Sequence, residues 1–329
     1  MSNLHGKKVL FIAANFFGYA SDIQCEIESR GATVNYLEDR PFSDAWKIAL
    51  AKLFPSLMQK FSNRYYRNKL KSYGDVHYDL VFVITGESLT QELLKEIRLS
   101  SPKAKFVLYI WDSILNKPGI LRLLDCYDEK YSFEKTAITN TKIKFRSLFF
   151  TSGFENVHAT EIKFLASFIG TMHSDRYSVL SQIKKSIPVA ANVFFYFYIQ
   201  APWVYWIYKL TKPSFMQSTI TDFKFKQLDK KTVQRVFFES KVILDIEHPS
   251  QSGLTMRTIE ALGAKKKLIT TNQNVASYDF FNVNNIYIID RADPVIPEEF
   301  FESEYEVPPE KIYNKYRLSY WLDDVLGHF

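Results

Sequence analysis

Short apolar runs that alternate with helical patterns are the feature that most limits how this chain folds. Residues 8–13 form one run, a helical pattern follows it as far as Gly31, and residues 33–37 form the next run. Further runs lie at 80–84, 106–111, 242–246, 267–270 and 286–289. Apolar strands separated by helices are typical of a parallel sheet that is covered on both faces. The sequence therefore predicts an α/β fold.

The alternation pauses once, in a polar stretch at 151–163, and then restarts. A chain of 329 residues is too long for one compact core and suits two domains of about 150 residues each. We expect two doubly wound, Rossmann-like domains, 1–160 and 161–307, and a C-terminal helix, 308–329, placed to pack back on the first domain. Ligands of such sheets bind beyond the carboxyl ends of the strands. The site is therefore expected in a central cleft that both domains face.

The net charge and the cysteine content indicate which partners and which cellular compartment to expect. The net charge is +6, but the basic residues do not gather in an arm of the kind that binds nucleic acid, so no nucleic-acid partner is expected. Cys25 and Cys126 cannot form a disulfide framework, and the first residues lack the pattern of a signal peptide. These observations favour a cytoplasmic protein.

One uncharged stretch, residues 188–208, is long enough to cross a bilayer. However, Ala201 and Pro202 interrupt it, its first half is rich in β-forming residues, and its second half has helical spacing of apolar groups. We predict a strand, a turn and an amphipathic helix, with a transmembrane helix as the alternative. Because Trp203 and Trp206 suit a membrane interface, peripheral contact with the inner face of the cytoplasmic membrane is a further hypothesis.

The stretch 245–272 carries the most chemistry. A strand ends, a loop of Pro, Ser and Gly follows, and a helix begins near Leu254. The start of such a helix offers free backbone N–H groups and a positive dipole end to an anion. Thr255 and Arg257 can hold a diphosphate there, and Glu260, one turn on, can accept hydrogen bonds from ribose hydroxyls. The structural alternative is that Thr255 only caps the helix while Arg257 and Glu260 form a surface pair.

The run Ser-Gln-Ser-Gly-Leu-Thr-Met-Arg-Thr-Ile-Glu-Ala-Leu at 250–262 resembles the nucleotide-sugar half of GT-B glycosyltransferases, in particular the CgeB-like group. It also resembles the broader family-4 pattern of two glutamates separated by seven residues. Glu260 matches the second glutamate, which holds the donor ribose in those enzymes. Ser252 stands in place of the first, so no role of that glutamate carries over.

Residues 168–177 resemble the opening of the same domain in members that build lipopolysaccharide and capsule. Gly170 ends a strand there and lets the backbone approach a ligand closely. Arg176 opens the next helix and is a candidate second phosphate contact, with an ordinary surface arginine as the alternative. The resemblance thus implies donor contacts from a set of six residues: Gly170, Arg176, Gly253, Thr255, Arg257 and Glu260.

The resemblance implies a glycosyltransferase of GT-B architecture. Such an enzyme would transfer a sugar from a nucleotide-sugar donor to a glycan or lipid-linked glycan acceptor. The product would be a growing bacterial surface glycan, whether lipopolysaccharide, capsule or exopolysaccharide. Two alternatives stay open: a sugar-nucleotide epimerase on the same scaffold, and a non-catalytic component of a polysaccharide assembly complex.

The N-terminal domain is expected to carry the acceptor contacts and the catalytic base. Asn15, Gly18 and Tyr19 follow the first strand and are candidate acceptor contacts. Asp112 and Glu87 follow two later strands, where burial can tune a carboxylate for general-base work. Each can alternatively serve a helix cap, and we rank Asp112 slightly ahead of Glu87.

Motifs for bound cofactors and metals are missing from the sequence. It has no Asp-x-Asp between a strand and a helix, no Gly-x-Gly-x-x-Gly, no P-loop and no Gly-x-Ser-x-Gly elbow. We therefore expect neither a metal ion nor a cofactor, and only the nucleotide-sugar as co-substrate. In this scheme the helix dipole and Arg257 stabilise the leaving diphosphate.

Overall fold

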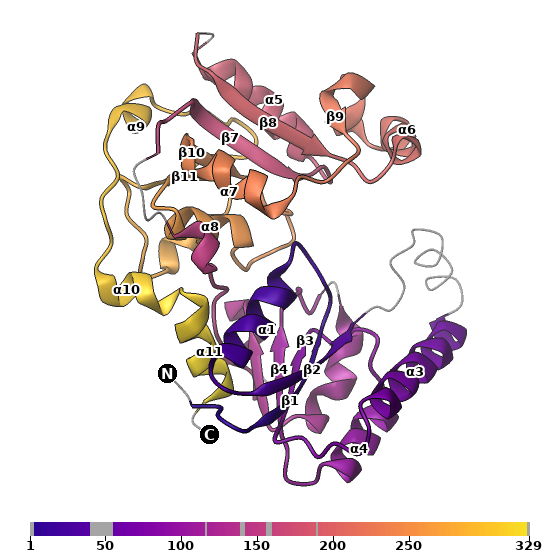
Figure 1. The fold of residues 1–329 in the computed structure, drawn as a ribbon. Helices are drawn as coiled ribbons and strands as arrows, with labels where there is room; N and C mark the ends of the chain where they lie inside the picture. The colour runs from indigo at the N-terminus through magenta and orange to yellow at the C-terminus, as the bar shows by residue number, and fades with distance from the viewer. Residues whose placement is uncertain are drawn as a thin grey trace. The chain divides into compact units, whose positions relative to one another are not determined.

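The computed structural model describes residues 3–39, 55–115, 117–138, 142–155, 160–188 and 190–327. The chain divides into unit 1, Met1–Ser147 with Leu318–Phe329, and unit 2, Leu148–Arg317. Each unit contains a six-stranded sheet whose paired strands are all parallel (Figure 1). The predicted α/β class with two doubly wound domains is confirmed.

The sheet of unit 1 has the strand order β2-β1-β3-β4-β5-β6. Its strands are β1 (Lys8–Ala13), β2 (Thr33–Glu38), β3 (Leu80–Ile84), β4 (Lys105–Ile110), β5 (Glu129–Ser132) and β6 (Lys144–Phe145). Its helices are α1 (Tyr19–Ser29), α3 (Pro55–Ser72), α4 (Gln91–Ser100), α11 (Leu318–Leu326) and the 3₁₀ helices η1 (Pro118–Cys126) and η2 (Lys135–Ile138). The strand order reverses between β1 and β3, because the chain leaves β1 toward β2 on one side and returns to β3 on the other.

Both faces of this sheet are covered, which explains why its strands are apolar throughout. Every residue of β3 is buried, and so is each residue of β4 after Lys105. Side chains that point to one face pack against α4 and η1, whereas Phe82 and Tyr109, on the other, contact Trp321 of α11. On that second face α1 and α11 lie side by side (Figure 1).

The sheet of unit 2 has the order β12-β11-β10-β7-β8-β9. Its strands are β7 (Phe164–Thr171), β8 (Val193–Tyr198), β9 (Phe223–Lys224), β10 (Ser240–Asp245), β11 (Lys267–Thr270) and β12 (Ile286–Ile288). Its α-helices are α5 (Arg176–Ser186), α6 (Pro202–Thr211), α7 (Lys230–Phe238), α8 (Met256–Gly263), α9 (Glu298–Glu302) and α10 (Glu310–Lys315). Short 3₁₀ helices are η3 (Ser152–Phe154), η4 (Pro213–Phe215), η5 (Ile220–Asp222) and η6 (Gln273–Ser277). Here the order reverses between β7 and β10.

The unit boundary lies at 147/148, earlier than the boundary near 160 that the polar stretch suggested. The reason is that the aromatic residues just after 147 belong to the core of unit 2. Phe150 packs on Tyr313 with 4.8 Å between ring centroids, and Phe154 packs on Phe237 at 5.3 Å. Large buried rings decide the boundary here, and the polarity of the following loop does not.

The expected single C-terminal helix over 308–329 is two helices that belong to different units. Helix α10 ends at Lys315, and the carbonyl of its C-cap residue Tyr316 accepts a hydrogen bond from the Phe150 amide at 2.8 Å. Only α11 packs on the sheet of unit 1, through the buried ring of Trp321. The break follows from the pairing of Phe150 with Arg317, which takes the chain out of helical geometry.

The uncharged stretch 188–208 folds as predicted, with β8, a turn, and α6 beginning at Pro202. Over the described part of the chain, no helix combines the length and the apolar character needed to cross a bilayer.

Candidate functional site

The loops that follow β7 and β10 meet at the reversal point of the sheet in unit 2. The two strands are direct neighbours, with Ser167 paired to Ile243. Where strand order reverses, the loops diverge to opposite faces and leave a crevice at the carboxyl edge, the usual ligand position in doubly wound sheets. Both stretches that the sequence singled out, 168–177 and 245–272, therefore come together at this edge.

Asp245, the last residue of β10, organises this edge. Its carboxylate is fully buried and accepts hydrogen bonds from the hydroxyls of Thr255 and Thr258, both at 2.6 Å. It also pairs with Arg257 Nη1 at 2.8 Å. A buried charge is tolerated only when it is paired and hydrogen-bonded. Three donors from the first turn of α8 and its cap thus fix that helix to the end of β10.

Arg257 joins β10 to β7 across the reversal point. Besides its pair with Asp245, its Nη2 donates to the carbonyl of Ile169 at 2.5 Å. A Cβ on Gly170 would lie 2.8 Å from Nη2, so Gly170 leaves room for the guanidinium. Arg257 therefore pairs with Asp245 within the unit.

Arg176 is buried, so it is not the ordinary surface arginine of the alternative interpretation. Its side chain donates to the carbonyls of Ile246 and Thr171, both at 2.6 Å. Burial, with the charge of Arg257 nearby, lowers the pKa of Arg176 to about 9. Arg176 thus holds together the chain segments that leave β10 and β7.

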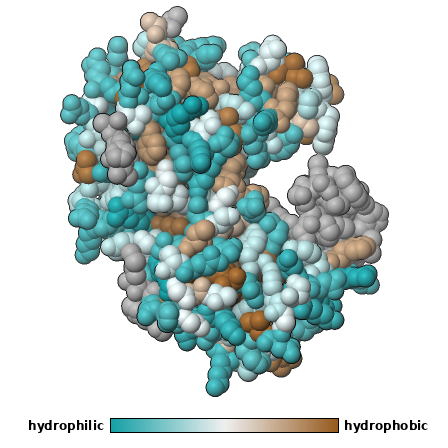
Figure 2. All heavy atoms as spheres, in the orientation of Figure 1, coloured by the Kyte–Doolittle hydropathy of each residue, from teal (hydrophilic) through white to brown (hydrophobic). Residues whose placement is uncertain are grey.

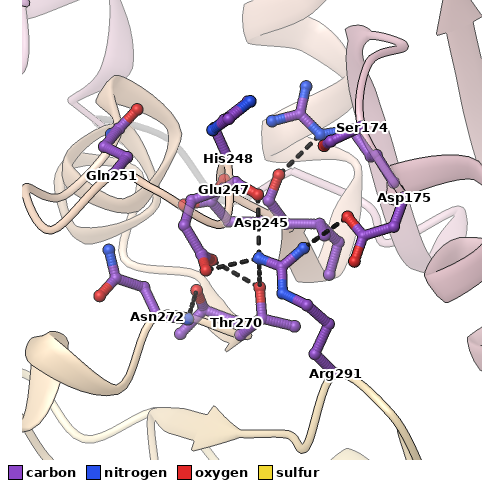
Figure 3. A network of polar contacts seen from close by, with 12 residues as sticks. Ser174, Asp175, Asp245, Glu247, His248, Gln251, Thr270, Asn272 and Arg291 are labelled. Carbon is purple, nitrogen blue, oxygen red and sulfur yellow. Dashed lines mark hydrogen bonds and ion pairs between the residues drawn. The ribbon is translucent and has the colours of Figure 1, made fainter. Parts of the chain in front are cut away.

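A second ionic cluster, centred on Arg291, was not found from the sequence. The Arg291 guanidinium pairs with Glu247 at 2.6 Å and with Asp175 at 2.8 Å, as Figure 3 shows. It also donates to the hydroxyl of Thr271 at 3.1 Å. One sequence feature could have pointed to Arg291: it comes just after the short apolar run 286–289. Residues that follow parallel strands lie at the carboxyl edge of the sheet.

Polar side chains shape the loop between β10 and α8. Gln251 and Asn272 both donate to the carbonyl of Gly253, at 2.9 and 3.1 Å. Thr255 caps α8 by accepting a hydrogen bond from the Thr258 amide. The start of α8 and the guanidinium of Arg257 both lie at this edge, where the Arg257 charge is paired with Asp245. Glu260 lies one turn further along α8 and is 5% exposed.

Two histidines, one from each loop, lie against each other at the same edge. The rings of His173 and His248 have centroids 5.3 Å apart. Burial first, and then the charge of Arg176, lowers the pKa of His173 to about 3. The adjacent Ser174 has a φ of 49°, a conformation that costs about 1–3 kcal/mol in a non-glycine residue and often occurs at functional sites.

In unit 1 the reversal point between β1 and β3 brings together the predicted acceptor-side loop and Glu87. The Asn15 amide donates to Glu38 at 2.8 Å, Gly18 has a φ of 78°, and the ring of Tyr19 lies 5.6 Å from that of Trp111. Non-glycine residues in both loops also have positive φ, 49° at Phe17 and 66° at Thr85.

Glu87 lies beside a hollow in unit 1, and a buried carboxylate shapes its loop. Asp39, 1% exposed, accepts hydrogen bonds from the amides of Glu87 at 2.9 Å and Ser88 at 3.1 Å. The hollow has a volume of about 690 Å³, and Glu87 and Lys117, which pair at 2.5 Å, both line it. Asp112 follows the neighbouring strand β4 and is not among the lining residues. Asp39 carried no motif and was not found from the sequence.

Within the ranges that the structure describes, no three His, Cys, Asp or Glu side chains are grouped as metal ligands would be.

No family model and no curated protein sequence matches this chain. Solved structures match it in fold. HepE of Anabaena, in complex with UDP and glucose, has a TM-score of 0.59 at 10% identity, over 97% of this chain and 98% of that one. A glycosyltransferase from Rickettsia africae has a TM-score of 0.57 at 12% identity, over 99% and 100%.

The catalytic domain of starch synthase IV from Arabidopsis thaliana, bound to ADP and acarbose, has a TM-score of 0.57 at 8% identity. That likeness covers 98% of this chain and 96% of the other. The fold is GT-B. This confirms the architecture that the resemblance implied, since both Rossmann-like units of the GT-B chain take part in the match.

The hydrogen bonds of Asp245 predict a strong effect on stability. We expect Asp245→Asn to lower the free energy of unfolding by about 3–5 kcal/mol, because Arg257, whose side chain is only 16% exposed, then loses its carboxylate partner. Urea unfolding followed by circular dichroism measures this. The matched control is Asp175→Asn, since Asp175 is more exposed and Arg291 keeps Glu247; a loss below about 1 kcal/mol is expected there. Equal losses would contradict the central role of Asp245.

The depressed pKa of His173 predicts a pH dependence of stability. Between its ordinary pKa of 6.5 and about 3, the unfolded chain binds a proton at His173 that the folded chain does not. Stability is therefore lost as the pH falls below 6.5, by up to about 1.4 kcal/mol per pH unit.

We expect the stability advantage of the wild type over His173→Gln to shrink by about 1–2 kcal/mol between about pH 7 and pH 5. Urea unfolding at both pH values measures the difference. The control is His5→Gln, at an exposed histidine of unit 1, measured at the same two pH values. A constant difference between wild type and His173→Gln would show that the histidine is not held neutral.

Proposed function

We propose that this protein is a glycosyltransferase whose unit 2 binds a nucleotide-sugar donor and whose unit 1 binds the acceptor. The observation that carries the proposal is the GT-B fold over nearly the whole chain, combined with an anion-type edge at the reversal point of unit 2. The HepE structure of the same fold contains UDP and glucose. Nucleotide-sugar transfer is the chemistry that makes use of both features.

On the donor side, the diphosphate would lie at the start of α8. The helix N–H groups and Arg257 would stabilise the negative charge that develops on the leaving diphosphate. Asp245 fixes Arg257 in place, so this charge is already oriented before the reaction. Because Arg176 already donates hydrogen bonds to two backbone carbonyls, it would act by positioning the two loops. Glu260 would accept hydrogen bonds from the ribose.

On the acceptor side, the loops with Asn15, Gly18 and Tyr19 would contact the acceptor, and Glu87 or Asp112 would accept the proton of its attacking hydroxyl. Glu87 has the support of lining the hollow of unit 1. Asp39 restrains the loop that carries Glu87, because it accepts hydrogen bonds from two of the loop's amides. Such a restraint suits a catalytic group that must be held in one geometry.

The acceptor would be a growing bacterial surface glycan, free or lipid-linked, as in lipopolysaccharide, capsule or exopolysaccharide. The support is the resemblance of 168–177 and 250–262 to enzymes of that group. We further propose that the reaction takes place in the cytoplasm and needs neither a metal ion nor a cofactor, because the helix start and Arg257 supply the positive charge.

Nucleotide binding tests the donor side. We expect one of UDP, GDP, CMP and ADP, or its sugar, to stabilise the wild type by roughly 2.7 kcal/mol at about 100 times its Kd, and to stabilise Glu260→Ala much less. A thermal-shift panel measures this. Glu298→Ala, on α9, is the control and should respond as the wild type does. If no nucleotide stabilises the wild type at saturation, the transferase proposal is wrong and a non-catalytic role gains support.

Turnover tests the acceptor side once the donor is known. Replacing the general base, by Glu87→Gln or Asp112→Asn, is expected to lower kcat by about 10²–10⁴-fold while the donor still binds. Asp75→Asn, an exposed carboxylate of unit 1, is the control and should leave kcat unchanged. Product analysis separates transfer from epimerisation of the donor, which would proceed without any acceptor. Unchanged kcat in both variants would exclude both carboxylates as the base.

A further inference from the structure

Helix α6 exposes an apolar stripe along its full length. Trp203, Trp206, Ile207 and Leu210 recur at intervals of three and four residues, so they share one face of the helix. Their exposed fractions are 58%, 55%, 48% and 85%. Met216, in the turn after the helix, is 66% exposed. A contiguous exposed apolar stripe of this kind marks an interaction surface, whereas single exposed apolar residues do not.

The orientation of α6 is fixed from its other face. Tyr205 is 2% exposed and packs on Phe223 with 5.3 Å between ring centroids. Its hydroxyl donates a hydrogen bond to the carbonyl of Ser218 at 3.1 Å. Lys209 bends back to the carbonyls of Met216 and Ser218. These contacts anchor the polar groups of the helix inward and leave the tryptophans outward. The stripe is therefore a feature of the folded unit 2.

The surroundings of α6 are free of acidic residues in the sequence. No Asp or Glu occurs between Asp175 and Asp222, while that stretch contains Lys184, Lys185, Lys209 and Lys212. Lys212, the C-cap residue of α6, has its Nζ 3.7 Å from the ring centroid of Tyr208. Figure 2 shows brown and pale surface over the region of α6. Positive charge beside apolar and aromatic side chains complements an anionic surface with an apolar layer beneath it.

We propose that α6, together with Met216, docks unit 2 onto the surface of an anionic lipid bilayer. A helix of ten residues is about 15 Å long and would lie in the plane of the headgroups. Trp203 and Trp206 would take the headgroup level that tryptophan favours, with Ile207 and Leu210 reaching the acyl chains. Lys212, at the end of α6, would add attraction to anionic headgroups. This proposal does not depend on the transferase activity.

Vesicle co-sedimentation of the full chain tests the proposal. We expect binding to vesicles of phosphatidylcholine with phosphatidylglycerol, weaker binding to phosphatidylcholine alone, and weaker binding at high salt. Trp203→Ser with Trp206→Ser should lower the partition coefficient by at least about 100-fold, because two large apolar groups that would insert into the bilayer are lost. Circular dichroism and thermal unfolding check that the variant is folded.

The matched control replaces Leu99 and Val283, which are exposed at 82% and 68% but lie outside α6, by serine. The control should bind vesicles as the wild type does. Two results would overturn the proposal. One is vesicle binding that the tryptophan variant retains in full. The other is a wild-type dimer that the tryptophan variant loses without any vesicle binding by either protein, which would make the stripe a contact between copies of this chain.

Discussion

The edge of unit 2 depends on one buried carboxylate. Asp245 ends a central strand at a depth where an unpaired charge would be too costly to keep. Its three donors come from the cap and first turn of α8, so they place the helix start directly after β10. Through Arg257 the same carboxylate reaches the backbone of β7. One charge thus sets the geometry of both loops at the reversal point of the sheet.

Unit 1 uses the same device in another place. Asp39, just after β2, accepts the amides of Glu87 and Ser88 and so shapes the loop after β3. In both units a buried aspartate restrains a loop at the carboxyl edge, and in both the nearby backbone has non-glycine residues at positive φ. Restrained loops with unfavourable backbone angles are expected where a ligand must meet preformed geometry. The proposed donor and acceptor sides both have this property.

The surface of α6 follows a different rule. Elsewhere in unit 2 large aromatic side chains fill the core, as Phe168 and Phe215 do. On α6 the inward face is already satisfied by Tyr205 and by Lys209, whose long side chain bends to backbone carbonyls. The apolar stripe therefore has no place in the core. Its exposure is best explained by a partner outside the chain, and the absence of Asp and Glu from residues 176–221 favours an anionic surface.

The sequence by itself determined the apolar strands, their alternation with helices, the strand and helix within 188–208, and the importance of 245–272. These features rest on patterns between residues close in the chain, where periodicity and helix starts act. Only the tertiary structure decided that Arg257 pairs with Asp245, that Arg176 is buried, that Arg291 and Asp39 shape the edges, and that the last helix is divided. Each of these depends on strand pairing, which brings distant residues together at one edge, so no local pattern could contain the choice of partner.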